Sequence, residues 1–257
     1  WNDYRHLEAY SAIGGAGTTV ESATLRAAER AALRRRAVEA CAGRVPVVMG
    51  TGTNATWSSV ENTKAAAGWG ADAFLVVTPY YNKPTQAGLL RHYEEIAKAA
   101  GGRPIIAYDV PGRTAVALAE DTIRRLADVP GITALKDATG DVDRLGRLAE
   151  ATPLTLLSGD DALTLRFMEK GATGVISVAA NVVPEAMARL CAERDPALHD
   201  RLAPLFKALF VESNPIPVKF ALARMGRIRN ELRLPLVPLS TRHEPAVLDA
   251  LQAAGAL

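Results

Sequence analysis

The chain has 257 residues, 49% of them hydrophobic and 23% charged, which suits one large α/β domain or two smaller ones. The formal net charge is only +2 and no long basic run occurs, so nucleic acid and an anionic membrane are poor candidate partners. The two cysteines, Cys41 and Cys191, form no CxxC pair, and we expect reduced thiols and a cytoplasmic protein. No apolar stretch reaches the ~18 residues of a membrane span. The four histidines show no HExxH spacing, so we expect no metal site.

Short apolar runs alternate with longer segments of helical spacing over the first 180 residues. The runs that we predict as strands are Ser11–Gly17, Val45–Gly52, Ala73–Pro79, Pro104–Val110, Ile132–Asp137, Thr155–Asp160 and Gly174–Ala180. Such runs are typical of strands buried on both faces, and their alternation with helical segments such as Gln86–Ala100 and Ala119–Ala127 predicts a parallel sheet. After Ala180 the pattern is helical to Leu257. We therefore expect a (β/α) barrel over residues 1–180 and a C-terminal helical extension over residues 181–257.

A closed barrel and an open doubly wound sheet both fit this alternation. An open sheet usually has a glycine-rich phosphate loop after its first strand, and Gly14–Gly17 lacks the GxGxxG spacing. Polar residues instead recur at or near the carboxyl ends of the strands: Thr18, Thr51, Thr78, Tyr108, Lys136, Ser158 and Ser177. In TIM barrels that face carries the chemistry, so the pattern favours a TIM barrel.

We expect Arg34, Arg35 and Arg36 on a solvated helix face.

Three side chains near these strand ends could carry covalent carbonyl chemistry. A strand-end lysine such as Lys136 can lose part of its hydration, which lowers its pKa and frees the amine for attack on a carbonyl. Tyr108, one strand earlier, could shuttle the proton that imine formation requires. Arg113 follows in the same loop and could bind a carboxylate. Each has a plainer interpretation as a surface lysine, a core aromatic residue and a surface ion pair.

Several stretches, taken together and in order, resemble the dihydrodipicolinate synthase family of pyruvate-dependent aldolases, which also includes N-acetylneuraminate lyase. The resemblance runs from about Asp3 to the C-terminus. The matching stretches are Gly17–Leu25, Thr78–Pro84, Tyr108–Thr114, Lys136–Gly140, Leu157–Asp161, Gly174–Val178, Asn214–Lys219 and Leu232–Pro235.

The resemblance implies a (β/α)8 TIM barrel that needs no cofactor and condenses pyruvate with L-aspartate 4-semialdehyde to give 4-hydroxy-tetrahydrodipicolinate. It also implies a homo-oligomer, either a dimer or a dimer-of-dimers tetramer. The implied catalytic residues are the Schiff-base Lys136, the proton-transferring Tyr108, and the relay residues Thr18 and Tyr81, the last reaching into a neighbouring subunit. The implied substrate-binding residues are Thr19 and Ile176 for pyruvate, Arg113 for the carboxylate of the second substrate, and Gly159.

Two features depart from the family pattern. The family's first strand precedes the matched region and has no counterpart here, so we expect a barrel that lacks it and exposes two sheet edges. Val20 stands where the family has glycine, and we expect a strained Val20 at positive φ. Two alternatives stay open: a pyruvate aldolase or lyase for a sugar acid, against which Arg113 argues, and a catalytically impaired homologue.

Overall fold

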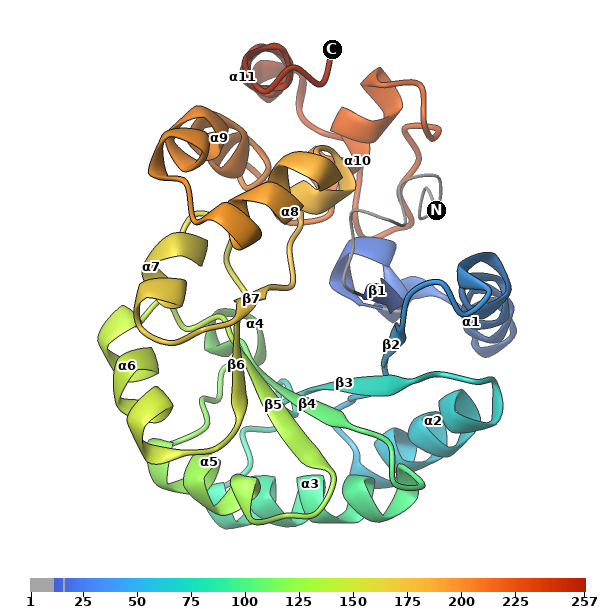
Figure 1. Cartoon of the computed structure of the whole chain (residues 1–257). Helices are drawn as coiled ribbons and strands as arrows, with labels where there is room; N and C mark the ends of the chain where they lie inside the picture. Colours follow the sequence, from blue (N-terminus) through green and yellow to red (C-terminus); the bar gives the residue numbers. More distant parts are fainter. Residues whose placement is uncertain (1–11, 16) are drawn as a thin grey trace.

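Seven parallel strands form one curled sheet in which the strands follow one another in chain order. The computed structural model describes residues 12–15 and 17–257. The strands are β1 (Ile13–Gly15), β2 (Val47–Gly50), β3 (Ala73–Val77), β4 (Ile105–Asp109), β5 (Ile132–Asp137), β6 (Thr155–Ser158) and β7 (Gly174–Val175). Figure 1 shows the sheet curling around a central axis with helices along its outer side. The seven strands and the TIM-barrel-like arrangement confirm the predicted fold class.

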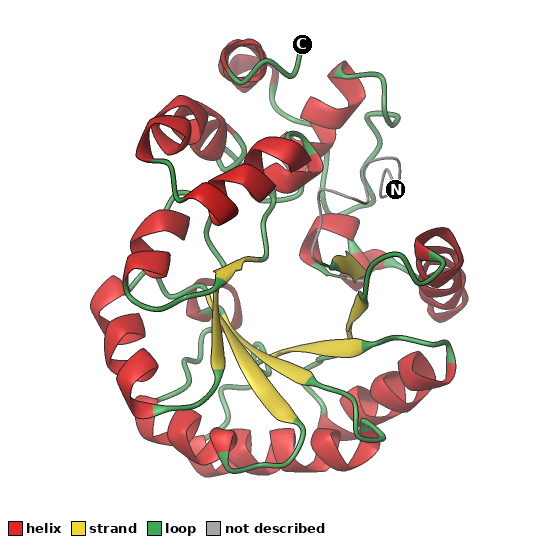
Figure 2. Cartoon of the chain, viewed as in Figure 1, coloured by secondary structure: helices red, strands yellow, loops and turns green. Residues whose placement is uncertain are grey.

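The helices fall into two sets. Those between strands are α1 (Ala27–Cys41), α2 (Thr56–Gly68), α3 (Gln86–Ala99), α4 (Pro111–Thr114), α5 (Glu120–Ala127), α6 (Val142–Ala151) and α7 (Thr164–Glu169). Those after the last strand are α8 (Pro184–Glu193), α9 (Pro196–Ala208), α10 (Ile216–Arg224) and α11 (Glu244–Ala253), which gather beside the open end of the sheet (Figure 2). Short 3₁₀ turns are η2 (Thr18–Val20), η3 (Ser22–Thr24), η4 (Ala179–Asn181) and η5 (Thr241–His243).

Short polar residues start several of the helices where the sequence pattern changes. The side chain of Thr85 accepts a hydrogen bond from Gly88 N at the start of α3, and Asp141 accepts one from Arg144 N at the start of α6. Asp195 caps α9 in the same way. Each cap satisfies an amide that has no partner within its own helix, which fixes where the helix begins.

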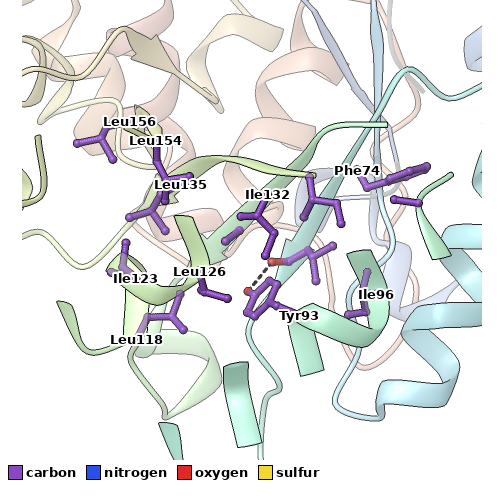
Figure 3. Packing of buried hydrophobic residues seen from close by; sticks show 14 of the residues in the cluster. Phe74, Tyr93, Ile96, Leu118, Ile123, Leu126, Ile132, Leu135, Leu154 and Leu156 are labelled. Atoms are coloured by element: carbon purple, nitrogen blue, oxygen red, sulfur yellow. Dashed lines mark hydrogen bonds between the residues drawn. The ribbon is translucent and has the colours of Figure 1, made fainter. Parts of the chain in front are cut away.

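Alternating strand residues separate a packed outer layer from the barrel interior. On β3, Phe74 and Val76 are fully buried toward the helices, whereas Leu75 and Val77 face the interior and line its cavity. Tyr93 of α3 packs on this outer face and donates from its hydroxyl to Val76 O at 2.8 Å (Figure 3). The outer layer therefore holds the strands in place, and the inner face is left for the site.

Two clusters of buried apolar side chains stabilise the chain. The first lies between the sheet and its surrounding helices and runs from Ile13 to Ala172. The second lies among the C-terminal helices and runs from Leu165 of α7 to Leu251 of α11. The division of the chain after residue 180 stays a prediction.

The last predicted strand is shorter than expected. Strand β7 ends at Val175, and the predicted residues up to Ala180 leave the sheet and enter η4. The reason is a buried carboxylate, because Asp161 Oδ2 accepts hydrogen bonds from Val178 N at 3.0 Å and Ala179 N at 2.8 Å. These amides are therefore not available for sheet pairing. At the other end, Ser11 and Ala16 of the first predicted strand and residues 1–10 lie outside the described residues.

The pairing of strands stops at β1 and β7. Within residues 12–15 and 17–257, the sheet is built from six neighbouring pairs, β1 with β2 through β6 with β7, and none joins β7 back to β1. This agrees with the seven strands that we expected, and the C-terminal helices lie on the side of the sheet where β1 and β7 end the pairing (Figure 1).

The prediction for the arginine cluster on α1 is wrong for Arg34. Arg35 and Arg36 are exposed, but Arg34 is only 3% exposed. Its Nη2 donates to Gly50 O at 3.0 Å, and its guanidinium lies 5.4 Å from the centre of the Trp69 ring. Burial lowers the pKa of Arg34 to about 10. These contacts between α1, β2 and the end of α2 could not be inferred from the run of basic residues alone.

Candidate active site

Lys136 and Tyr108 lie side by side at the carboxyl end of the sheet. They are direct partners between β4 and β5, and residues opposite each other in a sheet share a face. The Lys136 Nζ lies 4.1 Å from the centre of the Tyr108 ring. Strand pairing therefore delivers both predicted groups to one point inside the barrel.

Burial prepares the Lys136 amine for attack on a carbonyl. The residue is 8% exposed, and loss of hydration lowers its pKa to about 8. The charge of Arg113 lowers this pKa further, while the carboxylate of Asp161 opposes the change. Roughly 10% of Lys136 is therefore neutral, and so nucleophilic, at pH 7.

The Tyr108 phenol stays protonated at neutral pH. Burial raises its pKa, and the positive charge of Arg113 only partly offsets this rise. A protonated phenol beside an amine can donate a proton to a leaving hydroxyl and take it back later. The pair therefore has the groups that imine formation requires.

A buried arginine holds both residues from the outer face of the sheet. Asp109 follows Tyr108 and Asp137 follows Lys136, and both carboxylates are fully buried. Arg144 of α6 donates to Asp109 Oδ2 at 2.8 Å and to Asp137 Oδ2 at 3.0 Å. Burial raises the pKa of Asp109 to about 6, and the charge and hydrogen bond of Arg144 oppose that rise. We did not predict this bridge, although an aspartate directly after each of the two site residues was a signal.

One cavity collects most of the predicted site. It has a volume of about 1310 Å³ and extends into the barrel interior between inward-facing apolar side chains. Seven of the eight predicted site residues line it: Thr18, Thr19, Tyr108, Arg113, Lys136, Gly159 and Ile176. The eighth, Tyr81, is 88% exposed and does not line this cavity, whereas its neighbour Tyr80 does.

Gly159 leaves the space that the Lys136 side chain occupies. A Cβ on Gly159 would lie 2.6 Å from Ala138 Cβ, closer than such atoms pack, and 3.1 Å from Lys136 Cε, which is tighter than most such contacts. The Gly159 amide also donates to Asp137 O at 2.7 Å, which continues the pairing of β5 with β6. A glycine is therefore required for β6 to come this close to the lysine.

The turn after β1 corrects the expectation for Val20. Val20 ends the η2 turn and is not among the residues at positive φ, so it is not strained as predicted. The left-handed residue is Glu21, with φ 54° and ψ 36°. Its amide donates to Thr18 O at 3.0 Å. For a residue with a Cβ, this conformation costs about 1–2 kcal/mol, so the surroundings must hold it.

Contacts from the C-terminal helices supply that support. Lys219 of α10 donates to Glu21 Oε2 at 2.7 Å, and Asn214 Nδ2 donates to Thr19 Oγ1 at 3.3 Å. We singled out Asn214–Lys219 as a motif but did not predict its contact with the Thr18–Glu21 turn. About 200 residues separate the two segments, so no local pattern pointed to it.

Two features are absent from the part of the chain that the structure describes. No helix there is both long and apolar enough to cross a membrane. No group of three or more histidine, cysteine, aspartate or glutamate side chains there is arranged to bind a metal ion.

Relatives of known name match the chain over nearly its whole length. It is 48% identical over 265 residues to the 4-hydroxy-tetrahydrodipicolinate synthase of Pseudomonas aeruginosa, covering 99% of this chain and 90% of the relative. It is 46% identical over 264 residues to the enzyme of that name from Stutzerimonas stutzeri, with the same coverage.

Solved structures agree with the sequence relatives. The chloride-inhibited dihydrodipicolinate synthase of Acinetobacter baumannii, complexed with pyruvate, matches with a TM-score of 0.95 and 45% identity over 98% of this chain and 90% of that one. The Thermotoga maritima enzyme matches with a TM-score of 0.94 and 43% identity over the same shares. The profile of the Dihydrodipicolinate synthetase family matches residues 3–254, and the chain belongs to that family.

Proposed function

We propose that the chain condenses pyruvate with L-aspartate 4-semialdehyde to form 4-hydroxy-tetrahydrodipicolinate, in lysine and diaminopimelate biosynthesis. The observation that carries the proposal is the buried Lys136 amine, with a pKa of about 8, over the ring of Tyr108. The relatives that match nearly the whole chain are named for this activity. We propose the cytoplasm as the compartment of the reaction.

The reaction begins on Lys136. Its neutral amine attacks the C2 carbonyl of pyruvate, and the carbinolamine loses water to give an imine. Loss of a proton from C3 gives an enamine, whose carbon attacks the aldehyde carbon of the semialdehyde. The amino group of the adduct then attacks C2 and displaces the Lys136 amine, which closes the ring. Tyr108 and Thr18 transfer the protons of these steps.

The substrates are held by the groups around the lysine. In our proposal, Thr19 and Ile176 bind pyruvate largely through main-chain groups, and Gly159 leaves room for it beside Lys136. Arg113 binds the carboxylate of the semialdehyde, since a guanidinium offers two parallel donors to a carboxylate. This arginine favours the synthase reaction over cleavage of a sugar acid.

The proton relay is completed by a second copy of the chain. Tyr81 is exposed in the isolated chain and lies on the loop that follows β3. We propose that its hydroxyl reaches Thr18 of a partner subunit in a dimer or a dimer-of-dimers tetramer. One matching structure is that of a monomeric dihydrodipicolinate synthase variant. Because the proposal needs Tyr81 of a partner subunit, full activity of a monomeric form of this chain would contradict it.

Borohydride trapping tests the proposed function. Incubation with pyruvate and borohydride should add a reduced pyruvyl group to the peptide that carries Lys136. Lys136→Ala should abolish the label without unfolding the protein, and Lys98→Ala, which removes an exposed lysine of α3, should leave it intact. A label on another lysine, or on none, would refute the mechanism. Turnover with the semialdehyde against sugar acids then distinguishes the synthase from a lyase.

A further inference from the structure

We propose that Glu21 and Lys219 are positioning residues that hold the Thr18–Thr19 turn in its reactive geometry. The C-terminal helices then help to position active-site residues, in addition to packing beside the barrel. This inference rests on the proposed function, because it assigns the turn to pyruvate binding and proton transfer.

The ion pair is close and shielded from water. Lys219 Nζ lies 2.7 Å from Glu21 Oε2, and the side chains are 15% and 8% exposed. The other carboxylate oxygen accepts a hydrogen bond from Arg233 N at 3.0 Å. Two segments of the C-terminal part therefore bind one carboxylate of the barrel. Charged groups this buried are unfavourable unless each is paired, so either charge alone would be poorly tolerated.

The backbone at Glu21 has an unfavourable conformation that the Glu21–Lys219 ion pair can stabilise. Its left-handed conformation ends the η2 turn, and its amide donates to Thr18 O. Its carbonyl oxygen accepts from both Thr24 N and Thr24 Oγ1 at 3.0 Å. Since a residue with a Cβ rarely adopts this conformation without support, the pair with Lys219 fixes the direction in which the turn presents Thr18 and Thr19.

A second contact leads from the same helix entry to both proposed substrate sites. Asn214 is 6% exposed, and its Nδ2 donates to Thr19 Oγ1 at 3.3 Å. Arg113 Nη2 donates to Asn214 O at 3.5 Å. Lys219 N donates to Pro215 O at 3.0 Å in the first turn of α10, so a main-chain hydrogen bond ties Lys219 to the residue that follows Asn214. The start of α10 thus links the pyruvate side of the site to the side of the second substrate.

Neutralising the pair separates positioning from stability. Glu21→Gln and Lys219→Met each leave one largely shielded charge without its partner, so each should lower both stability and activity. The double variant carries no unpaired charge and should regain most of the urea midpoint. It still lacks the attraction that holds the turn, so its KM for pyruvate should stay at least tenfold raised and its trapping at Lys136 should stay slow.

Two further sets of variants test whether the loss of pyruvate affinity is specific to the Glu21–Lys219 ion pair. Glu120 and Arg147 form an ion pair of similar length, 2.8 Å, on the outside of the barrel. The double variant Glu120→Gln with Arg147→Met should keep the KM for pyruvate within twofold of the wild type. Lys219→Arg keeps a positive charge at the same position and should rescue part of the affinity that Lys219→Met loses.

The experiment measures kcat, KM for each substrate, the trapping rate, and hydrogen exchange of residues 17–25. We expect faster exchange in that peptide for the Glu21 and Lys219 variants, with the KM for pyruvate changing more than the KM for the semialdehyde. A folded double variant with wild-type KM, trapping and exchange would overturn the proposal. A wild-type protein that never traps pyruvate, but whose variants exchange faster in this peptide, would refute the proposed function while the turn is still shown to be held by the pair.

Discussion

Lys136 Nζ lies 4.1 Å from the centre of the Tyr108 ring, and the two residues are direct partners between β4 and β5. Burial disfavours the charged ammonium and lowers the pKa of Lys136 to about 8, although the nearby carboxylate of Asp161 opposes the change. The pKa of the amine therefore lies close to neutral pH, so its charge changes over the pH range in which enzymes are usually assayed.

The rate of trapping should follow this change of charge. With a pKa of about 8, roughly 1% of Lys136 is neutral at pH 6 and roughly 10% at pH 7. The initial rate of borohydride trapping should therefore rise close to tenfold between pH 6 and pH 7 and level off above pH 8. Lys136 trapping that is independent of pH between 6 and 9 would show that the amine is not limiting.

The same shift of pKa carries a cost in stability. The unfolded chain binds the Lys136 proton more tightly than the folded chain between about pH 8 and pH 10.5, so this group makes stability rise with pH across that window. Below it the cost is constant, on the order of 3 kcal/mol. Lys136→Met should therefore be more stable than the wild type at pH 7 by up to this amount. Urea unfolding checks this, and the advantage should shrink toward pH 10.

The bridge between Asp109, Arg144 and Asp137 predicts unequal effects of two substitutions. The three groups carry one positive and two negative charges, and at pH 7 Asp109, whose pKa is about 6, is mostly ionised. Arg144→Met leaves two buried carboxylates and should cost about 3–5 kcal/mol. Asp109→Asn leaves one balanced pair and should cost less than about 1.5 kcal/mol. Equal losses in urea unfolding at pH 7 would argue against a buried charge imbalance.

Features carried by a strand pattern could be predicted from the sequence. Lys136 and Tyr108 each end an apolar run, and parallel pairing of neighbouring strands brings their side chains together. The Thr18–Thr19 segment and Gly159 also line the cavity, as expected from their places after strands. Periodicity was enough for these because the sheet itself converts position in a strand into position in space.

Features that depend on contacts between distant segments could not be predicted. The end of β7 is set by the Asp161 carboxylate, and the left-handed Glu21 is held by Lys219, 198 positions away. The expectation for Val20 failed because a glycine in a family pattern does not say which residue of the turn carries the positive φ. Only the backbone of this chain assigns it to Glu21.

Val20→Gly should therefore not help the protein. Glycine in a helical turn costs about 0.5–1 kcal/mol in conformational entropy, and Val20 has no strain to relieve. We expect a loss of stability of that size and no gain in pyruvate affinity. Ala115 provides the contrast, because it is left-handed at φ 61°, so Ala115→Gly should be neutral or stabilising. Thermal unfolding of both variants checks the difference, and a more stable Val20→Gly would contradict the geometry of this turn.

Gly159 gives the most direct test of how closely the site is packed. An added methyl group would lie 2.6 Å from Ala138 Cβ and 3.1 Å from Lys136 Cε, so Gly159→Ala must displace β6, Ala138 or the lysine. Gly174 on the neighbouring strand is the matched control, since the nearest atom to its added methyl group is Leu157 Cδ2 at an ordinary 4.0 Å.

Displacement of the lysine should affect the reaction more than the fold. A change of only about 1.4 kcal/mol in the barrier lowers the rate tenfold, and small misplacements of a reacting group reach that size. We therefore expect Gly159→Ala to trap pyruvate at least tenfold more slowly, and Gly174→Ala to stay within about threefold of the wild type. Single-turnover trapping at saturating pyruvate measures both. Equal trapping rates for the two variants would show that Gly159 does not set the position of Lys136, because only one of the two substitutions crowds that side chain.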